Sequence, residues 1–266
     1  MKRITLAVTL LLASTLPITA QEHDHGPMMG TTIAQNSHRG TIIKLKSGND
    51  TIETEQFLAM GVQRPKSPAV ILIPEWWGLN DWVRDQARSL AASGFSVYTL
   101  DIYRGQEATD TDTAHQLSRA LPHDRAVRDL ESILHYIHAQ TGPTSKVGVI
   151  GWCMGGGIAL EFAIAEPNLQ AVVVNYGSLP TDDATLSKIQ APVLGNFGAK
   201  DKGITPEMVA AFDKQMKALG KRVDVKEYAD AGHAFQNENN KGGYNAADTA
   251  DAKRRTLIFL NTQLRR

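Results

Sequence analysis

Short apolar segments alternate with helical segments along most of this chain, and that alternation restricts its fold more than any other feature. The apolar segments are rich in β-branched residues, which is typical of strands buried on both faces of a sheet. They lie at residues 69–73, 147–150, 171–174 and 191–197. Between them, apolar side chains recur every three to four residues, as in helices that cover a sheet. The pattern predicts an α/β fold with a mostly parallel central sheet flanked by helices on both faces.

Other segments extend this pattern on both sides. Further strands are predicted at residues 41–46, 51–60, 95–103 and 223–228. Helices are predicted after the capping residues Asn80 and Thr205, and also over residues 126–137, 154–165 and 246–264. No linker rich in Pro, Gly or Ser interrupts residues 69–264. We therefore expect a single domain over residues 40–266.

The first twenty residues have the layout of a secretory signal peptide. Lys2 and Arg3 form a basic start, residues 4–12 are almost uninterrupted apolar chain, and small residues precede a cleavage position after Ala20. The apolar run is much shorter than the ~20 residues of a membrane-spanning helix. We therefore expect a cleaved leader at residues 1–20 and a periplasmic or secreted protein. An uncleaved N-terminal helix is the alternative.

The segment that follows the leader, residues 21–39, is polar and shows no periodicity, so we expect a flexible tail. It contains two histidines and two methionines, which are side chains that bind soft metal ions: His23, His25, Met28 and Met29. Ligands on a flexible segment define no coordination geometry. We therefore predict neither a metal site nor a cofactor.

Composition argues against several classes of function. Lys and Arg together number 28, as do Asp and Glu, so the formal net charge is zero and the basic excess typical of nucleic-acid binders is missing. A single cysteine rules out an intramolecular disulfide and a multi-cysteine metal site. No further apolar run approaches membrane length. We expect a monomer that acts on a small molecule, with no nucleic-acid partner and no membrane span.

That single cysteine lies where a strand is predicted to turn sharply into a helix. Residues 151–155 read GWCMG, with Cys153 at the centre. Glycine on both sides of a nucleophile is what a tight strand-to-helix turn requires, because the chain passes too close to itself for a Cβ. At a helix N-terminus, the unpaired N–H groups and the helix dipole favour a thiolate and an oxyanion. The alternative is a glycine-rich turn around a buried, inert cysteine.

A nucleophilic thiol needs a base, and the base needs an orienting acid. Asp201 directly follows the strand predicted at residues 191–197, and His233 follows the strand at residues 223–228. Both lie in loops at the C-terminal ends of strands, where open α/β sheets gather their functional groups. The order nucleophile, acid, base is that of α/β hydrolases. Read separately, Asp201 also fits a turn residue and His233 a structural loop histidine.

Six segments of the chain resemble, in order, those of the dienelactone hydrolases, a family of the α/β-hydrolase superfamily. They are residues 75–80 (EWWGLN), 101–105 (DIYRG), 151–156 (GWCMGG), 175–177 (NYG), 198–201 (GAKD) and 232–235 (GHAF). The resemblance implies that Cys153 is the nucleophile, His233 the base and Asp201 the group that orients the base. It implies that Glu75 is a buried glutamate that helps to activate the thiol; a salt-bridged residue at the end of a strand is the alternative.

The same resemblance implies further roles around the site. The backbone N–H groups of Trp76 and Met154 are expected to form the oxyanion hole, and Arg104 matches an arginine that contacts a substrate carboxylate. The residues expected to bind substrate are Trp77, Tyr103 and Arg104. For Arg104, an ordinary solvated arginine is the alternative; Trp76 and Trp77 also fit core aromatic residues.

One position departs from the family pattern. The best-known members carry a second arginine four residues after the histidine, paired to the glutamate and to the substrate, whereas this chain has Asn237 there. The partner of Glu75 must therefore differ, and a strongly anionic lactone finds one cation fewer. The fold and the nucleophile transfer to this chain better than the substrate does.

These residues predict a hydrolase of esters or lactones, and the resemblance implies that it is of the dienelactone type, also called carboxymethylenebutenolidase. The Cys153 thiolate attacks the carbonyl, two N–H groups hold the oxyanion, and His233 helps water to release the acid from a thioester. Because a free thiol is only a few per cent ionised at neutral pH, it has to be activated. Two alternatives are a non-catalytic protein that binds a small molecule and a thiol redox sensor.

Overall fold

The computed structural model describes residues 39–61 and 67–265. The predicted leader, residues 1–20, and the predicted His/Met-containing tail up to residue 38 lie outside the described residues. In the described part, no helix has both the length and the apolar character that crossing a membrane requires.

An eight-stranded sheet forms the centre of the fold, with strand order β1-β2-β4-β3-β5-β6-β7-β8. β1 pairs with β2, and β2 with β4, in antiparallel fashion, and every other pair is parallel. The predicted mostly parallel sheet is thus confirmed. The strands are β1 (Thr41–Ser47), β2 (Asp50–Phe57), β3 (Ala69–Ile73), β4 (Ser96–Leu100), β5 (Val147–Trp152), β6 (Ala171–Asn175), β7 (Val193–Gly198) and β8 (Val223–Tyr228).

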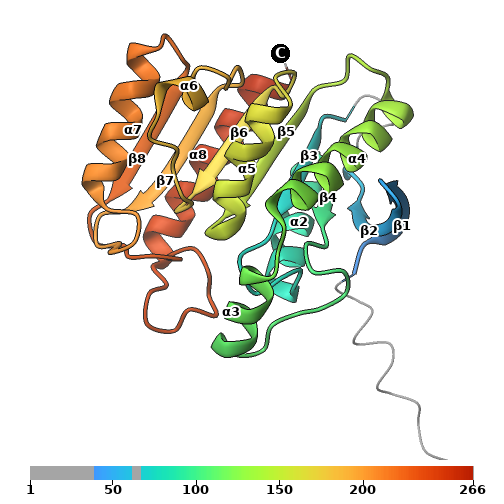
Figure 1. Ribbon diagram of the computed structural model, residues 1–266, viewed down its shortest axis with the longest axis horizontal. Coiled ribbons are helices and arrows are strands. Elements are labelled where there is room, and N and C mark those ends of the chain that lie inside the picture. Colours follow the sequence, from blue (N-terminus) through green and yellow to red (C-terminus); the bar gives the residue numbers. More distant parts are fainter. Residues whose placement is uncertain (1–38, 62–66, 266) are drawn as a thin grey trace, which may run out of the picture. The chain divides into compact units, whose positions relative to one another are not determined.

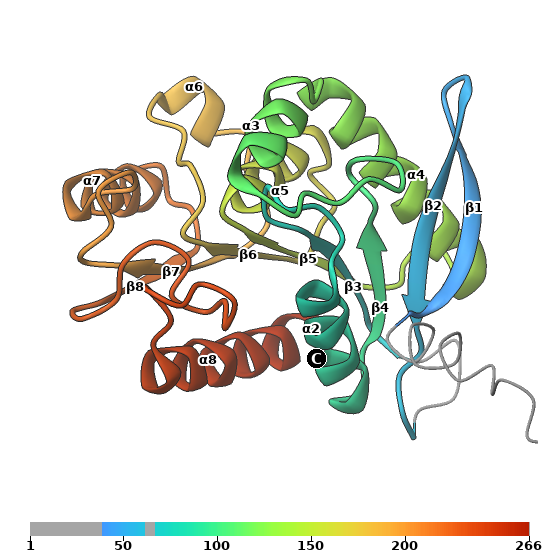
Figure 2. The same ribbon diagram turned by 90° about the horizontal axis from the view of Figure 1, so that it is seen from below.

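Helices cover both faces of this sheet, as the alternation predicts (Figures 1 and 2). One face is covered by α2 and α8, and the other mainly by α4, α5 and α7 (Figure 2). The helices are α2 (Asp81–Ala92), α3 (Thr111–Arg119), α4 (His123–Thr141), α5 (Met154–Ala165), α6 (Asp183–Leu186), α7 (Pro206–Ala218) and α8 (Ala246–Leu264). Each face has its own buried apolar cluster.

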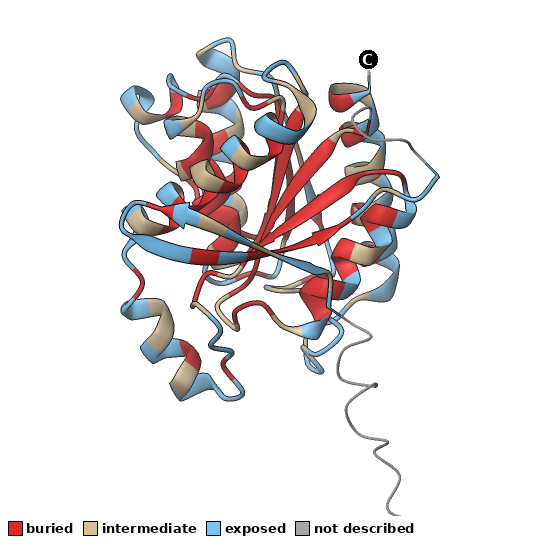
Figure 3. Cartoon of the chain, turned by 90° about the vertical axis from the view of Figure 1, so that its right-hand side faces the viewer, coloured by how far each residue is buried: buried red, intermediate tan, exposed pale blue. Residues whose placement is uncertain are grey.

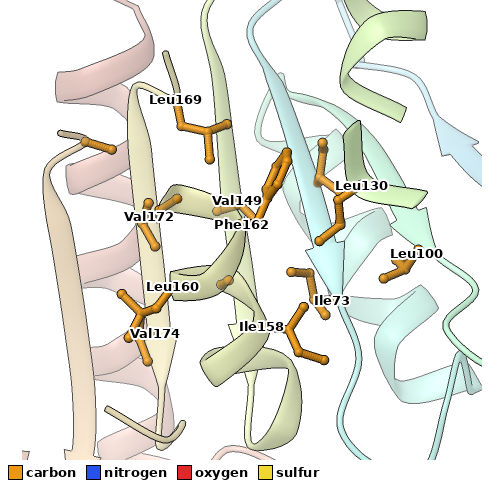
Figure 4. Packing of buried hydrophobic residues seen from close by; sticks show 14 of the residues in the cluster. Ile73, Leu100, Leu130, Val149, Ile158, Leu160, Phe162, Leu169, Val172 and Val174 are labelled. Carbon is orange, nitrogen blue, oxygen red and sulfur yellow. The ribbon is translucent and has the colours of Figure 1, made fainter. Parts of the chain in front are cut away.

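The central parallel strands are buried because helices cover both of their faces. All residues of β3, β4 and β6 are buried, whereas most residues of the edge strand β1 are not (Figure 3). Figure 4 shows aliphatic side chains of β5 and β6 meeting those of α5, with Phe162 among them. These strands are therefore held rigidly, which fixes the loops that leave their ends.

Local signals place several boundaries correctly. The side chains of Asn80 and Thr205 accept hydrogen bonds from the first turns of α2 and α7, as expected of helix caps. The predicted strand at residues 95–103 is too long, since β4 ends at Leu100. Residues 102–105 then form a turn, in which Arg104 and Gly105 take positive φ angles, of 55° and 87°. Helices α3 and α6 were not predicted; both are short.

The parallel arrangement decides where functional side chains gather. The C-terminal ends of β3, β5, β7 and β8 lie at one edge of the sheet. The loops that follow these four strands contain Glu75, Cys153, Asp201 and His233. Residues far apart in sequence are thereby brought to one place.

Candidate active site

Cys153 is the single residue between β5 and α5, and its backbone is strained. Its φ of 52° and ψ of −120° are unusual for a residue with a side chain. The turn is this tight because glycine flanks it. A Cβ on Gly151 would overlap the carbonyl oxygen of Gly155, and one on Gly155 would overlap the carbonyl oxygen of Pro74. The predicted strand-to-helix turn is therefore present, with the thiol partly exposed.

The three residues expected to act together are in contact. The Sγ of Cys153 lies 3.1 Å from Nε2 of His233, and Nδ1 of the same ring lies 2.7 Å from Oδ2 of Asp201. The other oxygen of Asp201 accepts backbone N–H bonds from Gly203 and Ile204, at 2.8 and 3.1 Å. The carboxylate is thus fixed in the orientation that holds the imidazole against the sulfur.

This arrangement favours a charged imidazole. Burial lowers the pKa of His233, but hydrogen bonds with Asp201 and Cys153, and the negative charge on both, outweigh burial and raise the pKa to about 10. For Asp201 burial has the opposite effect and raises the pKa. Hydrogen bonds from His233, Ile204 and Gly203 outweigh burial, so the pKa of Asp201 is lowered. An ionised Asp201 next to a ring that readily holds a proton suits proton transfer at Nε2.

Glu75 lies just beyond β3 and is 2% exposed. The hydroxyl of Tyr176 donates to its Oε1 at 3.1 Å, and Nδ2 of Asn237 donates to its Oε2 at 2.7 Å. Burial raises the pKa of Glu75, and these two hydrogen bonds and the nearby His233 oppose the rise without cancelling it. Asn237 is thus the partner that replaces the arginine expected from the family pattern.

Backbone strain is concentrated around these groups. Besides Cys153, Tyr176 and Ala234 take positive φ angles, of 41° and 54°. Tyr176 follows β6, and its ring meets the ring of His233 edge-on, with 5.3 Å between the centroids. Strained residues of this kind are retained where the surrounding structure holds a functional group in place. Tyr176 lies in the segment NYG, but no sequence pattern links its hydroxyl to Glu75.

Two cavities meet at the thiol. The larger, about 700 Å³, and the smaller, about 370 Å³, share three lining residues: Trp76, Cys153 and His233. Polar amides are prominent in the larger cavity, at Asn80, Asn237, Asn239 and Asn240, together with Trp77 and Lys241. The smaller cavity is lined by the basic residues Arg119 and His123 and by Met154 and Ser178. The geometry leaves room for a substrate on both sides of the sulfur.

Of the other residues predicted for the site, three line a cavity beside the thiol and Tyr103 does not. Trp76 and Met154, expected at the oxyanion hole, line the smaller cavity next to Cys153, and Trp77 lines the larger one. Tyr103 lines neither cavity: it is 4% exposed, and its hydroxyl donates to the carbonyl of Trp76 at 3.1 Å. Tyr103 thus supports the Trp76 loop from behind rather than facing a substrate.

Arg104 is not brought to either cavity. Its guanidinium donates to both oxygens of Asp129 on α4, at 2.9 and 3.1 Å, and Asp129 is 1% exposed. Reaching a substrate carboxylate would leave that buried carboxylate unpaired, which is costly. The expected substrate contact of Arg104 therefore does not fit the structure.

Metal ligands do not gather at this site. Among the described residues, no group of three or more His, Cys, Asp or Glu side chains is arranged to hold a metal ion. The chemistry that the arrangement offers is that of a thiol beside an imidazole and a carboxylate, at the N-terminus of α5.

The sheet order, the strand-to-helix turn and the loops around it define an α/β-hydrolase fold. The model of the dienelactone hydrolase family matches residues 55–264. The chain belongs to this family, as the sequence resemblance predicts.

Individual relatives agree with that assignment. A probable 2-oxo-3-(5-oxofuran-2-ylidene)propanoate lactonase from Bradyrhizobium is 30% identical over 222 residues, which cover 78% of this chain and 89% of the relative. A putative carboxymethylenebutenolidase from Escherichia coli is 30% identical over 73% of this chain and 78% of its own length. The protein is therefore an ester or lactone hydrolase of the dienelactone hydrolase type.

Solved structures support the same fold. A putative dienelactone hydrolase from Klebsiella pneumoniae superposes with a TM-score of 0.72 at 24% identity, over 83% of this chain and 98% of the other. A dienelactone hydrolase-like promiscuous phosphotriesterase from metagenomic libraries superposes with a TM-score of 0.75 at 26% identity, over 84% and 97% of the two chains.

Proposed function

We propose that the protein hydrolyses its ester or lactone through a thioester on Cys153, with His233 as the base and Asp201 as the residue that orients it. The observation that supports this most directly is the pair of short contacts, 3.1 Å from sulfur to imidazole and 2.7 Å from imidazole to carboxylate, at the meeting point of two cavities.

The first half of the reaction forms the thioester. The thiol proton passes to Nε2 of His233, and the thiolate attacks the carbonyl carbon. The N–H groups of Trp76 and Met154 stabilise the oxyanion. As the oxyanion collapses, the carbon–oxygen bond to the alcohol breaks, and His233 returns the proton to the departing oxygen.

The second half releases the acid. Water enters, His233 takes one of its protons, and the resulting hydroxide attacks the thioester carbonyl. The carbon–sulfur bond breaks, and Cys153 leaves as a thiolate. From a lactone the product is a single hydroxy acid, because the alcohol stays attached to the acyl chain.

Replacing Cys153 with alanine tests this mechanism. We expect turnover of a small aryl acetate to fall to background while circular dichroism and the thermal transition stay those of the wild type. One equivalent of iodoacetamide should inactivate the wild type, and mass spectrometry of quenched reactions should detect the acyl adduct. Multiple turnovers by the Cys153→Ala variant would exclude Cys153 as the nucleophile.

We also propose that the chain is exported as a monomer after cleavage at Ala20. The basic start, the short apolar run and the small residues before Gln21 support export. Mass spectrometry of the protein from the periplasmic fraction and from the medium should give a chain that begins at Gln21, and light scattering should give the mass of one chain. A protein that retains Met1 would contradict cleavage after Ala20. A particle with the mass of two or more chains would contradict the monomer.

A further inference from the structure

We propose that the larger cavity binds a neutral, hydroxyl-rich part of the substrate, so that the ester or lactone includes a sugar-like ring or a similar polyol. This inference rests on the proposed function, because it describes what occupies the cavity beside Cys153. The argument uses the charge of the cavity, its free hydrogen-bonding groups and its aromatic wall.

The charge of the larger cavity does not suit a strongly anionic ligand. Of its ionisable lining residues, Glu75 is held by Tyr176 and Asn237, and His233 is held by Asp201. Lys241 is the remaining cation among the described lining residues. The guanidinium of Arg104 is held by Asp129 away from the cavity. A carboxylate would meet a buried glutamate, an imidazole already paired with Asp201, and one exposed lysine.

Neutral polar groups line the cavity instead, and part of their hydrogen-bonding capacity is unused. The oxygen of Asn80 accepts from the N–H of Val83, which leaves its NH₂ group. The NH₂ group of Asn240 donates to the carbonyls of His233 and Ala234, which leaves its oxygen. These two lining side chains therefore offer the ligand one donor group and one acceptor.

Two further lining side chains add to this set. Within the described part of the chain, the side chains of Asn239 and Thr109 have no hydrogen-bond partner, and both are exposed. An amide offers both donor and acceptor atoms, and a hydroxyl does so with a single oxygen. Mixed neutral donors and acceptors match the hydroxyls of a polyol, each of which also donates and accepts.

The remaining wall is aromatic. Trp76 and Trp77 are half-buried, with ring centroids 5.1 Å apart and planes inclined by 61°, and both line the cavity. A sugar ring presents apolar C–H groups on its faces and hydroxyls at its edge. An indole face covers the former, and the amides bind the latter. A cavity of about 700 Å³ is within the range of specific small-molecule pockets.

The smaller cavity differs in charge. Besides His233, which lines both cavities, it is lined by Arg119 and His123, and no carboxylate lines it among the described residues. Outside that lining, Glu161 pairs with His123 at 2.9 Å. Any anionic group of a substrate is thus better accommodated on that side of the sulfur, which leaves the larger cavity for the neutral part.

Two matched pairs of substrates test the inference with the full enzyme. In the first pair, a methyl glucoside acetylated on its primary hydroxyl is compared with tetrahydropyranylmethyl acetate, which has the ring without the hydroxyls. In the second pair, glucono-δ-lactone is compared with δ-valerolactone, which places the hydroxyls on the acyl side. In at least one pair, kcat/KM should favour the hydroxylated member by about tenfold or more.

Single substitutions connect that preference to the cavity. Asn239→Ala and Thr109→Val should each reduce it about three- to tenfold, because one hydrogen bond to the substrate is lost. Asn261→Ala is the matched control: Asn261 is an exposed asparagine on α8 that lines neither cavity. We expect the control to keep the wild-type preference.

The possible failures are distinguishable. If the wild type hydrolyses none of these compounds and no aryl acetate, the proposed function is wrong. If it hydrolyses the unsubstituted members without preferring the hydroxylated ones, only the present inference is overturned. A preference for 4-carboxyphenyl acetate over its methyl ester that is lost on Lys241→Gln would also overturn it, by showing that the larger cavity binds anions.

Discussion

At the scale of single residues, the imidazole of His233 links stability to pH. Its pKa is raised to about 10 from an ordinary value of 6.5, so the folded protein holds the proton more tightly than the unfolded chain. The resulting stabilisation is complete below the unfolded value and is lost as the pH rises through about 10.

We therefore expect the free energy of unfolding of the wild type to fall, relative to that of a His233→Gln variant, between about pH 7 and pH 10. Urea titrations of both proteins across that range measure the difference. Parallel pH profiles would show that His233 has an unperturbed pKa in the folded protein, contrary to its contacts with Asp201 and Cys153.

Asn237 offers a second prediction at this scale, because its side chain donates a hydrogen bond to the buried carboxyl group of Glu75. In Asn237→Leu, one oxygen of Glu75 loses its partner, which should cost about 1–3 kcal/mol of stability near neutral pH. The pKa of Glu75, already raised by burial, should rise further. The loss should therefore be smaller near pH 5, where more of Glu75 is protonated. Urea unfolding at both pH values tests this, and equal losses would argue against it.

At the scale of elements, the turn between β5 and α5 depends on helix α5 approaching the loop after β3. A Cβ on Gly155 would meet the backbone carbonyls of Ile73 and Pro74, which have no freedom to move aside. Gly155→Ala should destabilise the protein by about 1–3 kcal/mol and reduce kcat. Gly242→Ala is the control, since a Cβ there has open space around it. Thermal unfolding of the two variants should separate them clearly; similar transitions would mean that the close approach is not needed.

A buried chain of amides joins this turn to the loop that holds His233. Asn175 accepts the backbone N–H of Cys153 at 3.0 Å, and its side-chain oxygen accepts from Nε2 of Gln236 at 2.9 Å. Gln236 in turn accepts from the indole N–H of Trp152 at 3.2 Å. The loops of the nucleophile and the base are thus held to each other through Asn175 and Gln236.

Removing this link should misplace the imidazole of His233 without changing the residues that line the two cavities. We expect Gln236→Leu to lower kcat about 10- to 100-fold with little change in KM, because small errors in alignment are costly. Gln86→Leu is the control, since Gln86 is also buried but its side chain donates to the carbonyl of Trp82 within α2. A rise in KM alone, or equal effects of both substitutions, would show that Gln236 does not align the base.

These elements also explain what could be predicted from sequence. The bounds of α5 and α8 match the predicted ones, and the glycine turn and the positions of Asp201 and His233 follow from local sequence patterns and from the order of strands. The environment of Arg104 does not, because its partner Asp129 comes from α4, 25 residues further along the chain. Likewise, no local pattern joins Tyr176 to Glu75, which lies 101 residues away.

At the scale of the whole described domain, Arg104 joins elements that are distant from the thiol. Asp129 on α4 accepts from Arg104 and from the hydroxyl of Ser47 on β1, and Arg104 also reaches Asp50 on β2 at 3.4 Å. The antiparallel edge of the sheet is thereby connected to the helix layer. Because Asp129 is buried, removal of its cation leaves an unpaired charge in the interior.

Arg104→Met should therefore destabilise the protein by about 3–5 kcal/mol, the range measured for breaking buried ion pairs. Because the side chain of Arg104 is 23% exposed, we expect a loss near the lower end of that range. The ratio of kcat/KM for a carboxylate-bearing lactone to that for a neutral lactone should remain at the wild-type value, because the guanidinium reaches neither cavity. Urea unfolding measures the first quantity and paired kinetics the second. A stable variant that selectively loses the anionic lactone would restore Arg104 to the substrate site and require its contact with Asp129 to break on binding.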